Sequence, residues 1–382
     1  MTVTADVAVV GGGVIGTAIA WRAAAAGLDA VLVDPQRDDG ASLVAAGMLA
    51  PVSESIFGEE ALLRLNLLAV RRFPTFAADL EERTGQHIGL RQEGTLAVAY
   101  DPGDHAALLR LTEFRRSVGL DAAELDSRAI RKLEPFLTPE VRGGALFAGD
   151  WSVDNRRYLA ALRQAARAAG VRTVPGLVSR ITSTGAELAG GGAISCGTVV
   201  VAAGWGSAGI AGLPGRLADV VRPVKGQLLR LRLPAAMPPV LSHTVRAMVR
   251  GTDVYLVPRA DGELVVGATQ EERGPDRTVT AGAVHDLLRD ALSVLPVLSE
   301  LVLAETCAGL RPGTLDNGPL VGPAGAGLLL ATGHYRNGIL LSAVTADAAV
   351  AWLTGQPPAA EWAPFTPDRF PAPVLHNEPG PA

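Results

Sequence analysis

The sequence predicts an α/β fold with two domains: a discontinuous one built on a parallel sheet, and an α+β domain with a mainly antiparallel sheet. Residues 4–34 read as strand, glycine turn, helix and strand, and apolar runs typical of buried parallel strands return at 199–204 and 328–333. From Gly226 apolar and polar residues alternate, as in an antiparallel sheet covered on one side only. At 382 residues the chain is too long for one ordinary core.

The opening unit has the pattern of a dinucleotide-binding site. Gly11, Gly13 and Gly16 match G-x-G-x-x-G between an apolar strand and a helix expected at Val14–Ala26. The first glycine permits the turn, the second lets backbone N–H groups approach a pyrophosphate, and the third lets the helix pack on the strand. Asp34 closes the second strand, where a carboxylate can accept a hydrogen bond from a ribose hydroxyl group. A glycine-rich turn without a ligand is the alternative, but this context favours a Rossmann-type site.

The bulk properties exclude several classes of protein. With 48% hydrophobic and 19% charged residues the chain is globular, and a net charge of −5 gives no footprint for nucleic acid. Cys196 and Cys307 form no disulfide framework and have no metal-ligand spacing, so we expect no metal and a reducing compartment. The first apolar run lacks a basic flank and is needed as a strand, and no apolar run approaches the roughly 20 residues of a membrane helix. We therefore expect a cytoplasmic protein with no membrane partner.

Between these landmarks the pattern predicts a series of helices and strands. The small residues from Ala41 to Pro51 suit either close contact with a bulky ligand or a tightly packed core helix. Residues 59–83 predict an amphipathic helix, bent or broken near Pro74. The other expected elements are helices at 104–118, 125–137, 156–169, 280–295 and 338–353, and strands at 94–100, 171–179, 198–203, 254–258 and 264–268.

The order of these elements predicts the domain boundaries. We assign residues 1–85, 146–220 and 303–355 to the nucleotide-binding domain, and residues 86–145 and 221–302 to the second domain. Residues 356–382 are rich in proline, which disfavours helix and central strand, so we expect a surface arm that fades into disorder.

Two late segments combine glycine turns with charged and aromatic residues. In residues 307–314, Arg311 is flanked by residues that shape the backbone, so its guanidinium can be held for bidentate recognition of a carboxylate. In residues 332–339 a buried strand ends at Gly333 and a helix starts soon after, so its N-terminus offers N–H groups to an electron-rich ligand. For Arg311 and Arg336 a surface ion pair is the alternative.

These motifs together resemble the FAD-dependent D-amino-acid oxidase family and, within it, the glycine oxidases of thiamine biosynthesis. Ala-Gly-Leu-Arg-Pro-Gly-Thr at 308–314 and Gly-His-Tyr-Arg-Asn-Gly-Ile-Leu-Leu at 333–341 carry most of the resemblance. The other matching stretches are 10–16, 45–49, 199–204, 223–226, 254–259 and 264–269, so the likeness runs through nearly the whole chain up to residue 355.

The resemblance implies a Rossmann-type FAD-binding domain and assigns residues to the site. Arg311 would clamp the substrate carboxylate, Tyr255 would hydrogen-bond it, and Arg336 would line the same pocket. Gln270 and Asp253 depart from the methionine and histidine expected of the family, which puts the substrate range in doubt. Residues assigned to FAD are Gly11, Gly13, Val14, Ile15, Gly16, Asp34, Pro35, Ala41, Ser42, Ala46, Gly47, Met48, Val178, His334, Tyr335, Arg336, Asn337, Gly338, Ile339 and Leu340.

The implied reaction is oxidation of glycine, or of another small amine or D-amino acid, by hydride transfer to FAD and reoxidation by O2. The products would be glyoxylate formed through an imine, ammonia and hydrogen peroxide, and the imine would pass to a thiazole synthase. Hydride transfer needs chiefly orientation, so no side-chain acid or base is expected, and His334 is given no such role.

Two other functions, the oligomeric state and the mode of flavin attachment stay open from the sequence. A D-amino-acid or sarcosine oxidase or dehydrogenase, and a flavin-binding assembly protein, are the competing functions; the oligomeric state, including a homo-oligomer, is also undetermined. Cys307 stands where sarcosine oxidases carry a covalent flavin link, but nothing basic beside it favours a thiolate, so we expect non-covalent FAD.

Overall fold

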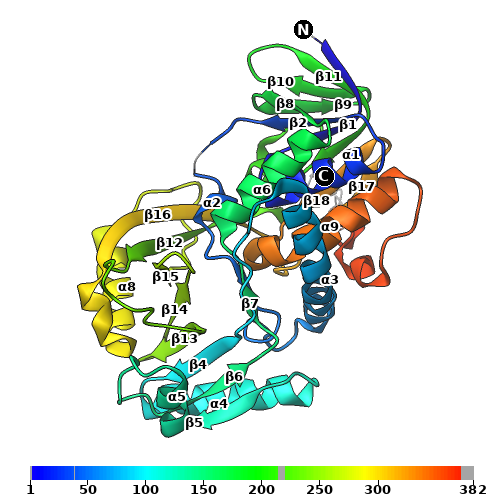
Figure 1. Ribbon diagram of the computed structural model, residues 1–382. Helices are drawn as coiled ribbons and strands as arrows, with labels where there is room; N and C mark the ends of the chain where they lie inside the picture. Colours follow the sequence, from blue (N-terminus) through cyan, green and yellow to red (C-terminus); the bar gives the residue numbers. More distant parts are fainter. Residues whose placement is uncertain (1, 38, 214–219, 371–382) are drawn as a thin grey trace, which may run out of the picture.

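The computed structural model describes residues 2–37, 39–213 and 220–370 and contains two large sheets (Figure 1). In the first, β1 pairs in parallel with β2 and β11, β11 with β18, and β2 with β8. Its main path is β17 (Leu320–Gly325), β18 (Leu328–Thr332), β11 (Ala193–Val201), β1 (Thr2–Val10), β2 (Ala30–Asp34) and β8 (Arg172–Pro175). Off this path, β10 (Gly185–Leu188) pairs with β11, and β9 (Val178–Thr182) pairs with β10. The predicted α/β fold is confirmed, and the sheet unites the start, middle and end of the chain.

Alternation along β1 explains how this sheet is covered on both faces. Val7 and Val9 pack into one core with four helices, while Ala8 and Val10 pack on the opposite face with strands β9 to β11. The helices of the first face are α1 (Val14–Ala25), α3 (Glu60–Thr84), α6 (Asn155–Ala168) and α9 (Gly338–Leu353). The carboxyl ends of the parallel strands therefore remain as the edge open to a ligand.

The second sheet is antiparallel apart from the parallel pair β13 and β4. The strand order is β16 (Val302–Gly313), β12 (Arg222–Arg232), β15 (Glu263–Gly267), β14 (Thr252–Pro258), β13 (Thr244–Val249), β4 (Thr95–Ala99), β6 (Gly143–Phe147) and β5 (Ala123–Asp126). Helix α8 (Ala281–Val294) covers one face with Leu287, Ala291 and Val294. Helices α4 (Pro102–Ser117) and α5 (Ser127–Leu133) lie at the β5 end (Figure 1).

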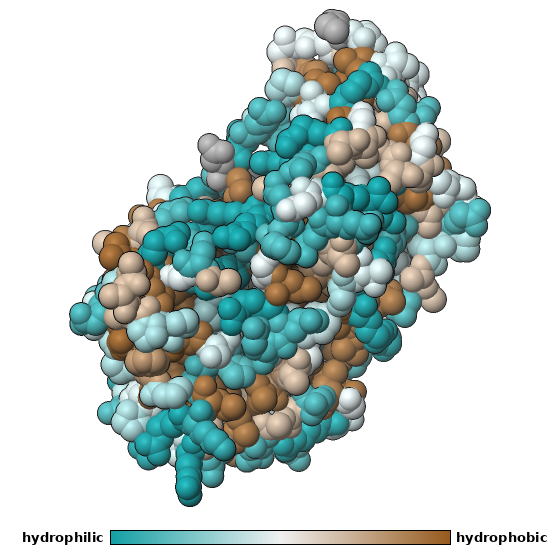
Figure 2. Space-filling view, viewed as in Figure 1, coloured by the Kyte–Doolittle hydropathy of each residue, from teal (hydrophilic) through white to brown (hydrophobic). Residues whose placement is uncertain are grey.

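Smaller elements join the two sheets. They are α2 (Ala41–Val44), the two-stranded sheet of β3 (Met48–Leu49) and β7 (Trp151–Ser152), and the 3₁₀ helices η1 (Gly204–Gly209) and η3 (Tyr335–Asn337). A further 3₁₀ helix, η2 (Pro296–Glu300), follows α8 and packs in the core of the second sheet. Figure 2 shows mainly hydrophilic residues over the region between the sheets and hydrophobic ones gathered around α8. No helix of the described residues has the length and apolar character needed to span a membrane.

The division of strands between the sheets differs from the expected domain boundaries. The boundary predicted at residue 146 falls inside β6, and the segment predicted to start at 303 begins in β16, which pairs with β12. Both strands belong to the second sheet, because they are hydrogen-bonded to strands of that sheet. The pattern of residues does not specify which strands pair. The domain boundaries themselves stay a prediction.

Several expected elements differ from prediction, and the strand expected at 171–179 is divided between β8 and β9. Helix α3 runs unbroken through Pro74, because its fully buried Phe73, Phe76 and Leu80 offset the one hydrogen bond that proline removes. The helix expected at 125–137 is only α5, since residues 123–126 extend as β5 and Asp126 caps the helix by accepting the Ala129 N–H.

The sheet was expected to face solvent or a ligand on its uncovered side; its strands β12 and β14 line a cavity, and three polar residues inside β12 are buried, whereas Arg232 at its end is exposed. Lys225, Gln227 and Arg230 are at most 1% exposed. Lys225 is ion-paired with Asp276 at 2.6 Å, and Arg230 with Glu263 at 2.6 Å. Carboxylate partners, of which Asp276 is partly exposed, therefore replace water for the two buried cations of this strand.

The expected surface arm is also partly wrong. Residues Ala360–Phe365 and Pro367–Arg369 form the 3₁₀ helices η4 and η5, and Trp362 and Phe365 are buried in the core of the first sheet. Proline is compatible with these short turns because it occupies the first position of a turn or a position where no N–H donor is needed. Residues 371–382 of the predicted arm lie outside the described residues.

Candidate active site

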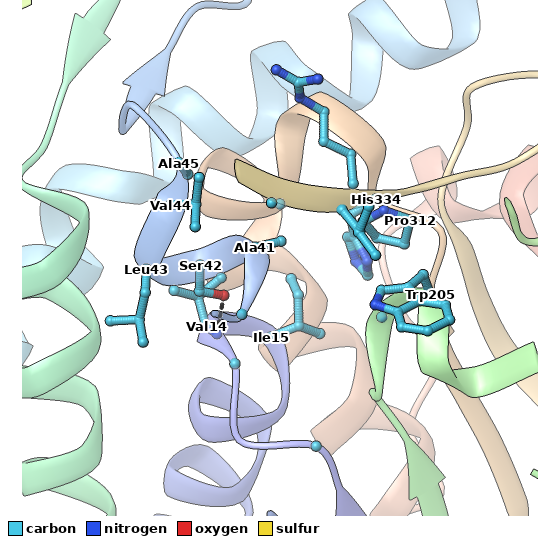
Figure 3. A pocket seen from close by; sticks show the side chains of 18 of the residues that line it. Val14, Ile15, Ala41, Ser42, Leu43, Val44, Ala45, Trp205, Pro312 and His334 are labelled. Atoms are coloured by element: carbon cyan, nitrogen blue, oxygen red, sulfur yellow. Dashed lines mark hydrogen bonds between the residues drawn. The ribbon is translucent and has the colours of Figure 1, made fainter. Parts of the chain in front are cut away.

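A cavity of about 450 Å³ lies where the carboxyl ends of the parallel strands meet the second sheet. The β1–α1 turn, α2 and η1 line one part of it, and β12, β14 and β16 line another. Figure 3 shows Ser42 beside the start of α1, with Trp205, Pro312 and His334 beyond Ile15. All predicted site residues line this cavity except Gly16, Asn337 and Leu340.

Glycine is needed at the three motif positions for different physical reasons. Gly11 has φ +109°, and a Cβ there would lie 2.5 Å from the Ala202 carbonyl oxygen. A Cβ on Gly16 would collide with the Gly11 carbonyl oxygen, so Gly16 serves helix packing and does not line the cavity. Gly13 has an ordinary φ of −74°, and a Cβ on it would meet only Ser42 Oγ, at 3.0 Å. The turn thus leaves open the one side on which a ligand can approach the backbone.

The start of α1 offers polar groups to that open side. The Val14 N–H donates to Ser42 Oγ at 3.0 Å (Figure 3), and the first N–H groups of a helix have no intrahelical acceptor. Asp34 lies against the turn, accepts the Gln36 N–H at 3.2 Å and has Arg163 Nη2 3.7 Å away. Its carboxylate keeps lone pairs for a hydroxyl group. These features suit a pyrophosphate with an adjoining ribose.

The segment after β18 forms another wall of the cavity. His334 is 3% exposed, and its Nε2 lies 3.0 Å from Thr345 Oγ1. Burial lowers the pKa of His334 to about 3, so the ring is neutral at physiological pH. Gly338 and Ile339, the first residues of α9, line the cavity, whereas Asn337 and Leu340 turn away from it.

Arg311 and Tyr255 meet at the second sheet, and glycines on the neighbouring strands make room for both. A Cβ on Gly226 would collide with the Arg311 guanidinium, and one on Gly267 would lie 2.5 Å from the Tyr255 hydroxyl oxygen. Arg311 Nη1 donates to the Thr269 carbonyl oxygen at 3.2 Å. Burial raises the pKa of Tyr255, so its hydroxyl stays protonated and can donate. The pair presents a fixed cation beside a hydroxyl donor.

Other charged residues of the cavity were not predicted from the sequence. Arg246 stands opposite Tyr255 in the register of β13 and β14, and its Nη1 lies 2.9 Å from Glu54 Oε1. Arg277 pairs with Asp39 and lies over the Trp205 ring, with its Cζ 5.5 Å from the ring centroid. The pair of Arg246 and Glu54 could not be found from sequence spacing, because the two residues are 192 positions apart.

The structure places the two residues that depart from the family pattern, Gln270 and Asp253, and also Cys307. Gln270 lines the cavity and accepts a hydrogen bond from Arg336 Nη2 at 3.0 Å, and Asp253 lines the cavity as well. Cys307 does not line the cavity but packs beside a small apolar cluster that includes Val44. Burial raises the pKa of its thiol, which disfavours the thiolate.

A Rossmann-type turn at the edge of a parallel sheet, joined to a pocket with a cation, defines a nucleotide-dependent enzyme with a second, small ligand. The sequence matches the family described as FAD dependent oxidoreductase over residues 6–352. The chain belongs to this family. The predicted resemblance, the enzyme class and the cofactor FAD are thereby confirmed, and the open side of Gly13 fits that cofactor.

Individual relatives are similar over the whole chain. It is 35% identical over 374 residues to a glycine oxidase of Geobacillus kaustophilus, covering 96% of this chain and 97% of that protein. The crystal structure of a glycine oxidase from Geobacillus kaustophilus has a TM-score of 0.87, with 33% identity and coverage of 97% and 100%. The bifunctional protein ThiO/ThiG of Synechocystis sp. is 34% identical over 378 residues, covering 97% of this chain and 55% of that protein. The chain thus spans about half the length of the bifunctional relatives it matches.

Proposed function

We propose that this protein oxidises glycine, and other small amines that fit the same pocket, with FAD as the electron acceptor. The observation that carries the proposal is the pair Arg311 and Tyr255, which share one cavity with the glycine turn. A carboxylate-binding cation in reach of a flavin is what an α-amino acid substrate requires. The names of the glycine oxidase relatives support the choice of glycine.

We place the dinucleotide along the residues assigned to it. The open side of Gly13 and the N–H groups at the start of α1 would receive the pyrophosphate, and Asp34 would accept a ribose hydroxyl. The start of α9, with Gly338 and Ile339, would lie against the flavin ring. When bound, FAD takes up the hydride that leaves the substrate α-carbon. Cys307 is outside the cavity lining, which supports non-covalent binding.

The protein side chains would supply binding and orientation. Arg311 would form a bidentate contact with the substrate carboxylate, and Tyr255 would donate its hydroxyl to the same group. Arg336 would stand at the rim, where Gln270 and the ring of Tyr335 hold its guanidinium. His334, neutral and bonded to Thr345, would not transfer protons. Orientation against the acceptor would then account for most of the rate enhancement.

We propose O2 as the final acceptor, with glyoxylate, ammonia and hydrogen peroxide as products in the cytoplasm. Fusion to ThiG in similar proteins supports hand-over of the imine to a thiazole synthase. A sarcosine or D-amino-acid oxidase or dehydrogenase and a flavin-binding assembly protein are the competing outcomes.

The test supplies the yellow holoprotein with glycine, sarcosine or D-alanine. Turnover is measured as oxygen uptake, peroxide formation and ammonia release. We expect all three signals with glycine. Turnover with an artificial acceptor but no oxygen uptake would indicate a dehydrogenase. No turnover with any amine would contradict the proposal and favour an assembly role.

A further inference from the structure

One wall of the cavity is held almost entirely through its backbone. Residues 41–48 contain α2 and the start of β3, and their side chains are mostly small. All eight residues from Ala41 to Met48 line the cavity. The last carbonyl groups of so short a helix have no intrahelical donor, so the shape of this wall depends on what donates to them.

The donors come from behind the wall. Asn155 Nδ2 donates to the carbonyl oxygens of Ser42 at 2.9 Å and Leu43 at 3.0 Å. Arg230 Nη2 donates to the carbonyl oxygens of Leu43 at 3.3 Å and Ala45 at 3.5 Å. Neither donor lines the cavity, so both act on the wall without touching a ligand.

Arg156 Nε also donates to the Leu43 carbonyl oxygen, at 3.2 Å, and Arg259 is a further donor behind the wall. Arg259 Nη2 donates to the carbonyl oxygen of Ala46 and lies 3.5 Å from Asn155 Oδ1. It also packs behind Gly47, where a Cβ would come within 3.2 Å of the same nitrogen. Since Arg259 follows β14 and Arg230 belongs to β12, the strands that carry Tyr255 and Gly226 are tied to the cofactor wall.

This arrangement is costly for an ordinary stabilising contact. Arg259 is 6% exposed and Arg230 1%, and within the described residues Arg259 Nε and Nη1 and Arg230 Nε have no hydrogen-bond partner. Arg230 has Glu263 as a counter-ion, whereas the recorded acceptors of Arg259 are neutral. Because taking a guanidinium out of water is costly, the net contribution of such a buried charge to stability is small.

We propose that Arg259, with Arg230 and Asn155, positions the backbone of residues 41–48 before FAD binds, and that cofactor affinity depends on this although none of the three contacts the cofactor cavity. The inference concerns FAD binding and does not depend on which amine is oxidised. Arg259 is the sharpest member to test, because its donor atoms reach only the wall and Asn155.

The experiment measures FAD affinity of apoprotein by flavin fluorescence titration for Arg259→Met and Arg259→Lys. We expect the dissociation constant to rise about ten- to a hundredfold in Arg259→Met, the range for loss of a charged hydrogen bond, with an unchanged unfolding midpoint of the apoprotein. Arg259→Lys retains one donor and should recover most of the affinity. The matched control is Arg232→Met, which removes an exposed arginine from the end of β12.

Each outcome decides the matter. An unchanged dissociation constant in Arg259→Met would overturn the proposal, and so would parallel losses of affinity and apoprotein stability that lysine does not rescue, since they indicate only a structural role. If Arg259→Met does not fold, the FAD affinity of Arg259→Lys and the hydrogen exchange of the wild-type apoprotein test the proposal. The Leu43 and Ala45 amides should be protected without FAD, because they donate to the carbonyl oxygens of Gly40 and Ala41 in the turn of α2, and absence of that protection would contradict positioning before binding.

Discussion

The guanidinium of Arg311 on β16 lies against Gly226 of the adjacent strand β12, in space that a Cβ would occupy. The glycine is therefore part of the carboxylate site although it has no side chain. We expect Gly226→Ala to displace Arg311 and to lower kcat/KM for glycine while FAD stays bound. Gly282→Ala on α8 is the control, because nothing lies within 4 Å of the added Cβ. Equal kcat/KM values in the two variants would contradict this role of Gly226.

Replacement of Arg311 itself tests the same site directly. Arg311→Ala should keep FAD and lose about 2–5 kcal/mol of transition-state stabilisation, because a charged hydrogen-bond partner is removed from a desolvated pocket. Arg311→Lys should also fail, since a point charge lacks the planar fork. Steady-state kinetics with glycine measure both effects, and wild-type kinetics in both variants would remove Arg311 from the substrate site.

The open side of Gly13 predicts a change that affects the cofactor alone. Gly13→Val introduces a side chain where the pyrophosphate is placed, while the φ of −74° accepts any residue. We expect a folded protein without flavin, and partial loss in Gly13→Ala, whose Cβ meets only Ser42 Oγ. Flavin absorbance per folded protein is the measurement. Full occupancy in Gly13→Val would show that FAD binds elsewhere.

The buried His334 predicts a dependence of stability on pH. Its pKa is about 3 when folded and 6.5 in the unfolded chain, so below pH 6.5 only the unfolded state gains a proton. The free energy of unfolding should therefore fall by about 1.4 kcal/mol per pH unit as the pH drops below 6.5, and His334→Asn should remove this part. Denaturant unfolding at about pH 5 and about pH 7.5 measures it.

A control separates this effect from the general acid response of the protein. His285→Asn replaces a histidine that is 71% exposed on α8 and should leave the pH dependence as it is in the wild type. The same loss of stability toward acid in His334→Asn and in the wild type would show that the buried ring does not titrate in this way.

How much the sequence could predict depended on whether a feature is local. Gly11, Gly13 and Asp34 lie within one βαβ unit, so their spacing was enough to predict that they share one site, and all three line the cavity. Arg246 and Glu54 could not be predicted, because their contact follows from the pairing of β13 with β14 and from a distant loop. Packing also modified what single residues suggest: α3 is not broken at Pro74, and the burial of Trp362 brings a proline-rich segment back onto the core.

The central claim is that a small amino acid held by Arg311 reduces the flavin in this cavity. Its most direct test is anaerobic rapid mixing of the yellow holoprotein with increasing glycine, in the wild type and in Arg311→Ala. We predict saturable bleaching of the visible flavin band in the wild type, recolouring with peroxide when air is admitted, and bleaching in the variant only at far higher glycine. A wild-type flavin that stays yellow with glycine, or a variant that bleaches at the same concentrations, would contradict the account.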